Sequence, residues 1–176
     1  MNFKKTLKFK KKDILTKWFE ITINTYPEET SKIFNRSKNK FDNPVGVATY
    51  ECLESVIDML YENMELPDNQ PLNDELIERA LDSVIRIRAV QDFSASRAVG
   101  FVFELKDIIR QIARDNLTNS FDRKVDQIAL AAFNRFLKCR ENIFLLKALE
   151  AKKRTYSAFE RSGLAEELKE EDLLGS

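Results

Sequence analysis

The chain of 176 residues carries 29 Lys plus Arg and 29 Asp plus Glu, so its formal net charge at pH 7 is zero. This balance provides no overall field toward nucleic acid or an anionic surface, and we expect neither a nucleic-acid partner nor membrane insertion. Hydrophobic residues make up 43% of the sequence, with only 4 Gly, 4 Pro and no histidine. The composition favours long helices around one core, and it excludes a histidine base, metal ligand or haem ligand.

The amino-terminal segment has lysine at six of its first twelve positions. Charged residues interrupt the apolar run that a signal peptide requires, and no stretch reaches the ~18 apolar residues of a membrane span. We therefore expect a mature chain that starts at Met1 in the cytoplasm. The lysine run is interpreted as a solvated flexible arm, with contact to an acidic partner as the alternative. Residues 7–25 have apolar side chains at helical spacing, and Tyr26-Pro27 ends that helix.

Four more helices follow before residue 113. Asn43 precedes Pro44, which suits the first helical position, and Asn73 and Ser94 are placed as N-caps of later helices. The helix after Asn73 is so apolar that we expect it to be mostly buried. These helices are predicted over residues 28–34, 43–64, 73–91 and 94–112.

The last helix is predicted to begin near Phe121 and to continue without Gly or Pro to residue 162. At ~1.5 Å per residue it reaches roughly 60 Å, against a diameter of roughly 40 Å for a compact chain of this size, so we expect its end to overhang. The predicted fold is an all-α, single bundle of five to six helices with a long C-terminal helix. We assign residues 1–165 to one domain and residues 166–176 to an acidic flexible tail.

One stripe of the last helix advances by alternating steps of four and three residues, which is typical either of a coiled-coil seam or of a core-facing stripe. The stripe consists of Val125, Ala129, Ala132, Phe136, Cys139, Ile143 and Leu146. Apolar residues on an overhanging end would be exposed in a monomer, so a second copy or another protein is expected to cover them. The residues expected at such a homodimer or partner surface are Ile143, Leu146, Leu149, Tyr156 and Phe159.

A polar cluster lies where the 73–91 helix ends and the next begins. One hypothesis is a ligand corner, in which arginines and free N–H groups at the helix start hold an anion or carboxylate. The alternative is structural: Asp92 and Ser94 cap helices, while the arginines pair with Asp92, Glu104 or helix-end carbonyls. The cluster consists of Arg86, Arg88, Gln91, Asp92, Ser94 and Ser96.

Three phenylalanines, Phe101, Phe133 and Phe136, form either a pocket for a small apolar ligand or ordinary core. Cys52 and Cys139 lack the spacing of a zinc or redox motif and are expected to be reduced and buried. Without a histidine base, a phosphate-binding glycine loop or a buried acid pair, no catalytic arrangement is indicated. We expect no cofactor, no metal site and no enzyme activity; a less favoured enzyme hypothesis would use Arg86, Arg88 and nearby acids.

Four sequence segments, TYPEET, FDNPVG, IRIRAVQDFSASRAVGFVFELKDIIR and CRENIF, occur in this order. Together they resemble the RsbT co-antagonist protein RsbRD N-terminal domain family over residues 10–160, and the block at residues 85–94 is the most specific part. The resemblance implies a non-haem, globin-like sensor domain of bacterial stressosome proteins, dimeric and active through protein-protein interaction.

In multidomain members of that family the final helix leads into a STAS output domain, whereas this sequence ends at Ser176. We therefore expect a separate signalling partner protein instead of an attached output domain. The resemblance also leaves an alternative open, in which the chain is a constitutive accessory protein of an anaerobic respiratory system, binding a respiratory partner and no ligand.

Overall fold

A computed structural model describes residues 3–36, 41–64, 70–91, 93–113 and 119–162. The described residues form seven α-helices and no strand, so the predicted all-α class with a long C-terminal helix is confirmed. By its contacts the chain divides into two units, Met1–Cys139 and Arg140–Ser176. The acidic tail at 166–176 lies outside the described residues. The helices are α1 (Phe3–Ile23), α2 (Glu28–Arg36), α3 (Pro44–Glu62), α4 (Asp74–Val90), α5 (Ala95–Val99), α6 (Phe101–Ala113) and α7 (Asn119–Ser162).

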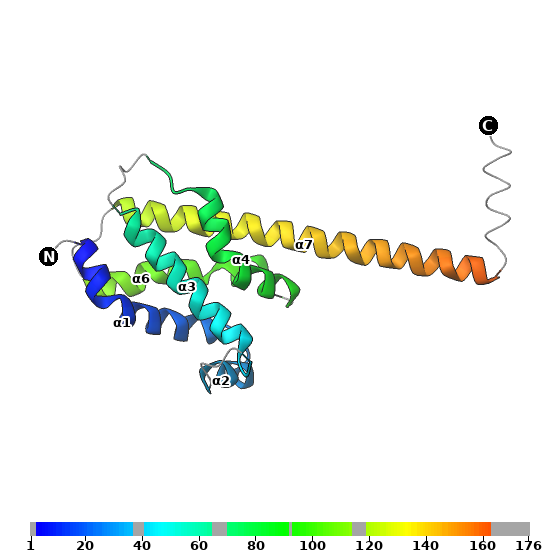
Figure 1. The fold of residues 1–176 in the computed structure, drawn as a ribbon, viewed down its shortest axis with the longest axis horizontal. Helices are drawn as coiled ribbons and strands as arrows, with labels where there is room; N and C mark the ends of the chain where they lie inside the picture. Colours follow the sequence, from blue (N-terminus) through cyan, green and yellow to red (C-terminus); the bar gives the residue numbers. More distant parts are fainter. Residues whose placement is uncertain (1–2, 37–40, 65–69, 92, 114–118, 163–176) are drawn as a thin grey trace. The chain divides into compact units, whose positions relative to one another are not determined.

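The core of the first unit is centred on α1 and α3. Helix α1 packs against α3 and α6, while α3 also packs against α2 and α4 (Figure 1). Each helix turns one apolar stripe inward, as the three- and four-residue spacing of the sequence predicts. Side chains with no exposed surface include Ile14 and Trp18 of α1, Leu53 and Leu60 of α3, and Leu81 and Ile85 of α4.

The lysine-rich amino terminus is helical, so the expectation of a flexible arm is wrong. Helix α1 begins at Phe3 and its Leu7 is only 2% exposed, which anchors the first turns to the core. Lysine loses little rotamer freedom in a helix and keeps its charged end in water. Lys11 also joins α1 to α3 through ion pairs with Asp58 at 2.6 Å and Glu54 at 3.2 Å.

The predicted helix caps are confirmed. Asn43 is buried; its Oδ1 accepts from the Gly46 N–H at 2.9 Å and its Nδ2 donates to the Phe34 carbonyl at 2.6 Å. Any side chain at position 46 would overlap Asn43, which explains the glycine there. Asn73 accepts from two N–H groups at the start of α4. Local side-chain chemistry therefore places both helix starts.

The helix predicted over 94–112 is in fact two helices, α5 and α6, separated at Gly100. The Gly100 N–H donates to the Ser96 carbonyl at 2.8 Å, and the Phe103 N–H donates to the Gly100 carbonyl at 3.0 Å. A Cβ at Gly100 would lie 2.9 Å from the Ser96 oxygen. Glycine thus permits a close backbone approach at the boundary between the two helices.

Within the first unit, the α7 stripe packs into its own core. Val125, Ala129, Ala132, Phe136 and Cys139 are each at most 8% exposed. Of the two interpretations of this stripe, the core-facing one holds as far as Cys139. Ion pairs on the surface add to this packing: α7 pairs with α4 through Arg135–Asp82 and Lys138–Glu78, and with α6 through Asp126–Lys106 and Asp122–Arg110.

None of the helices in the described part of the chain combines the length and the apolarity that a membrane crossing needs.

Candidate functional site at the α4–α5 corner

Arg88, in the last turn of α4, stands out among the described residues because it is charged and 0% exposed. Its Nη1 donates to the carbonyls of Arg97 at 3.0 Å and Ala98 at 3.3 Å. Its Nη2 donates to the Thr22 carbonyl at 3.1 Å and to the Thr25 hydroxyl at 3.0 Å. One guanidinium therefore joins the ends of α1, α4 and α5.

The acceptors around Arg88 explain how a buried cation is stabilised here. Thr22 lies in the last turn of α1, and Arg97 and Ala98 in the last turn of α5, where the carbonyls give a helix end its partial negative charge. No carboxylate among the described residues pairs with the guanidinium. Its Cζ lies 4.7 to 5.2 Å from three ring centroids, a distance that permits cation–π attraction. The rings belong to Phe101, Phe93 and Tyr26.

Three buried polar atoms at this corner have no hydrogen-bond partner of ordinary geometry in the described part of the chain: Arg88 Nε, the Tyr26 hydroxyl oxygen and Gln91 Oε1. Burial lowers the pKa of Arg88 from its ordinary value, and the nearby Tyr26 opposes that change. Arginine remains charged at neutral pH even so, because its pKa starts far above 7. The corner is thus a permanent positive charge within an aromatic shell.

Two further side chains hold the segment from Arg97 to Phe101, which we call the α5–α6 joint. Arg97 donates from Nη2 to the Thr25 carbonyl at 2.8 Å, and its guanidinium lies 5.4 Å from the Phe93 ring centroid. Trp18 donates from Nε1 to the Phe101 carbonyl at 2.6 Å. The joint therefore takes hydrogen bonds from α1 and α4 at three carbonyls, those of Arg97, Ala98 and Phe101.

The structure separates the predicted polar cluster. Arg86 lies on the surface, 63% exposed, and pairs with Asp82 at 3.0 Å. Ser94 is the N-cap of α5, as predicted, and its hydroxyl lies 3.2 Å from that of Ser96. Gln91 ends α4 by donating its N–H to the Ile87 carbonyl at 3.1 Å. Asp92 lies outside the described residues.

The other predicted residues also occupy different environments. Phe101 and Phe136 are buried, Phe133 is 38% exposed, and no ring contact joins any two of them among the described residues. In the second unit Ile143 is partly buried. Leu146, Leu149, Tyr156 and Phe159 are 39% to 63% exposed.

Sequence reasoning singled out Arg88 and Phe101 but missed the other residues that form this corner. Thr22 and Thr25 precede Arg88 by 66 and 63 residues, so no local pattern links them to it. The one available signal was the helix end at Thr25-Tyr26-Pro27, where unpaired carbonyls need donors. The missed residues are Trp18, Thr22, Thr25, Tyr26, Phe93 and Arg97.

Cys52 lies near this corner and is 2% exposed. Both Cys52 and Cys139 are free and buried, as predicted. Burial raises the pKa of the Cys52 thiol to about 12, while the positive charge of Arg88 acts in the opposite direction. The thiol is therefore protonated and unreactive at neutral pH.

This raised pKa makes a prediction about alkaline stability. The folded state holds the Cys52 proton up to about pH 12, whereas the unfolded chain releases it near its ordinary pKa of 9.0. Cys52 thus contributes stability that is complete below pH 9 and is lost as pH rises toward 12. Between pH 8 and pH 10 we expect the free energy of unfolding of the wild type, measured in urea, to fall by about 1–2 kcal/mol more than that of Cys52→Val. Equal losses in both proteins would contradict a buried, protonated thiol.

Among the described residues, no group of three or more His, Cys, Asp or Glu is placed to bind a metal ion. At the corner itself, the groups present are a guanidinium, hydroxyls, carbonyls and aromatic rings. Their geometry fixes helix ends to one another and thereby sets how the helices pack.

The fold and the corner together define a class of protein. It is an all-helical domain in which a polar joint between helices lies inside the core, and a long final helix follows that joint in the sequence. The chain belongs to the RsbT co-antagonist protein rsbRD N-terminal domain family, whose model matches residues 12–149. The predicted family is thereby confirmed, and membership implies a stressosome-type sensor or regulatory domain. No curated protein and no solved structure matches the chain significantly.

Proposed function

We propose that this chain is a non-catalytic sensor or regulatory domain that passes its state to a separate protein through α7, and that it does so as a homodimer. The observation that carries the proposal is the apolar surface of the second unit. There, large apolar side chains of α7 are 39% to 73% exposed. These residues are Phe144, Leu145, Leu146, Leu149, Tyr156 and Phe159.

The spacing of these residues supports a helical partner. Leu149 and Tyr156 are seven residues apart, and Leu145 and Phe159 are twice seven residues apart, as in the seam of a coiled coil. Apolar patches of this kind on a folded protein mark surfaces that another molecule covers. A second copy presents the same helix and is the simplest molecule that could complete the seam.

The corner supports a regulatory output more than a chemical one. Arg88 makes four hydrogen bonds to this chain's own atoms, so its donors are largely satisfied before any ligand arrives. That closed geometry also favours the second candidate function, a constitutive accessory protein with no ligand. Native mass spectrometry of protein purified from its own host separates the two, because a retained small molecule supports sensing and a bare chain mass supports the accessory role.

The dimer is tested by Leu149→Glu, which places a charge in the proposed seam. We expect the wild type to sediment as a dimer at micromolar concentration and the variant to dissociate at least about tenfold more readily, since burial of one leucine contributes about 1.5–3 kcal/mol. The matched control is Arg154→Gln, which changes charge by the same amount at an exposed position of α7 outside the seam. A monomeric wild type, or equal weakening by both variants, would contradict the proposal.

A further inference from the structure

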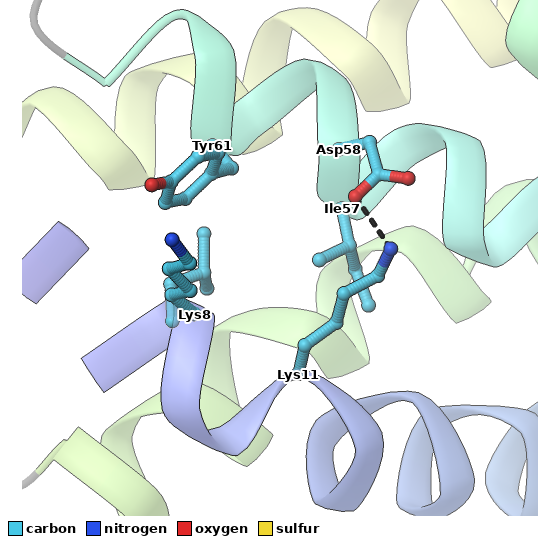
Figure 2. A pocket seen from close by; sticks show the side chains of 6 residues that line it. Lys8, Lys11, Ile57, Asp58 and Tyr61 are labelled. Atoms are coloured by element: carbon cyan, nitrogen blue, oxygen red, sulfur yellow. Dashed lines mark ion pairs between the residues drawn. The ribbon is translucent and has the colours of Figure 1, made fainter. Parts of the chain in front are cut away.

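A half-open groove of about 210 Å³ lies between the first turns of α1 and the end of α3. Its residues come from both helices: Leu7, Lys8 and Lys11 from α1, and Ile57, Asp58 and Tyr61 from α3. Figure 2 shows Lys8 beside Tyr61 on one side and the Lys11–Asp58 ion pair on the other, with Ile57 next to that pair. Leu7 and Ile57 are at most 2% exposed, so the floor is the apolar core itself.

Charge is distributed unevenly around this groove. Lys11 forms ion pairs with two carboxylates, those of Asp58 and Glu54. Lys8 is exposed and pairs with no carboxylate in the described part of the chain. The Lys8 side of the groove therefore carries an unpaired positive charge, whereas the Lys11 side carries one net negative charge, from one ammonium and two carboxylates.

We propose that this groove binds a short amphiphilic monoanion, a carboxylate with a linear apolar chain. The carboxylate would pair with Lys8 beside Tyr61, and the chain would lie over Leu7 and Ile57. A single negative charge fits best, because the two carboxylates next to Lys11 repel a polyanion such as a phosphate ester. The chain must be short, because the groove is smaller than the ~300–1,000 Å³ pockets of drug-sized ligands.

This site differs from the polar corner and does not depend on the dimer. It is formed by residues of α1 and α3 within the first unit, whereas the proposed dimer seam lies on α7. Binding to the groove is therefore measured independently of any regulatory output.

The experiment titrates octanoate into the full-length, isotope-labelled protein and follows backbone amide shifts by NMR. We expect saturable shifts at Leu7, Lys8, Ile57 and Tyr61 with a Kd on the order of 1 mM, as suits a short ligand in an open groove. Octanol, which has the same chain without the charge, is expected to bind about fivefold more weakly, the ratio that an exposed ion pair supports.

Two variants make the test specific. Lys8→Ala should weaken octanoate binding about fivefold and remove its preference over octanol, while leaving the fold intact because Lys8 is exposed. Lys17→Ala removes the same charge from an exposed position of α1 outside the groove. It should change neither the affinity for octanoate nor the preference for octanoate over octanol. Equal binding of octanoate and octanol by the wild type, equal effects of both variants, or shifts confined to other residues would overturn the proposal. It would also be overturned if the groove amides shift on dilution without ligand, because a second copy would then be the occupant.

Discussion

Replacing Arg88 with methionine is expected to lower the free energy of unfolding by about 2–6 kcal/mol, because two buried carbonyls lose their donor. Methionine has a similar length but no donor. The carbonyls of Arg97 and Ala98 would lose their side-chain donor inside the protein, and an uncompensated buried acceptor costs about 1–3 kcal/mol. Urea unfolding monitored by Trp18 fluorescence measures the change, because Trp18 is fully buried and contacts the same joint.

Two further variants identify the cause of this loss. Arg86→Met removes an arginine two residues away whose ion pair with Asp82 is largely exposed, and it should cost less than about 1 kcal/mol. Arg88→Lys keeps the charge but not the planar fork that reaches α1 and α5 together, so an intermediate loss of about 2 kcal/mol is expected. If Arg88→Met and Arg86→Met unfolded at the same urea concentration, the buried guanidinium would not hold the helix ends together.

The sequence predicts the helices well because their signals are local. Asn43, Asn73 and Ser94 act as caps within three residues of their own position, and the apolar spacing of α1, α3, α4 and α7 needs no tertiary information. The division of α5 from α6 was missed for a physical reason. A lone glycine in a helical pattern is tolerated at a cost of about 1 kcal/mol, so the sequence by itself does not mark Gly100 as a helix boundary.

The candidate site was less predictable because it is made by distant parts of the chain. Whether Arg88 holds a ligand, an acid or a helix end depends on what α1 places beside it, and Thr22 lies 66 residues away. The α7 stripe was ambiguous for a different reason, since a core-facing stripe and a coiled-coil seam have nearly the same period. Burial as far as Cys139 resolves the first part of the stripe, while the exposed residues beyond it belong to the proposed dimer surface.

The α5–α6 joint receives hydrogen bonds from two helices, and this arrangement predicts energetic coupling between Trp18 and Arg88. Trp18→Ala should cost about 3–5 kcal/mol, mostly through the cavity left in the core. Trp18→Phe keeps an aromatic ring against Phe101 and loses the indole hydrogen bond to its carbonyl, for an expected loss of about 1–2 kcal/mol. Trp18→Phe is therefore the variant that isolates the bond to the joint.

A double-mutant cycle then tests whether the joint acts as one element. Once Arg88→Met frees the carbonyls of Arg97 and Ala98, the Phe101 carbonyl is no longer held in place for Trp18. Trp18→Phe should therefore lower the free energy of unfolding by less in the Arg88→Met protein than in the wild type. The cycle is measured by urea unfolding followed by far-UV circular dichroism, because Trp18→Phe removes the single tryptophan. We expect Arg88→Met combined with Trp18→Phe to destabilise the protein by about 1 kcal/mol less than the two single losses together. Arg88→Met combined with Lys138→Met, which removes an exposed ion pair between α7 and α4, should be additive within about 0.5 kcal/mol. Additivity in both cycles would mean that α1 and α4 hold the joint independently, and a change at the corner could not be passed from one helix to the other.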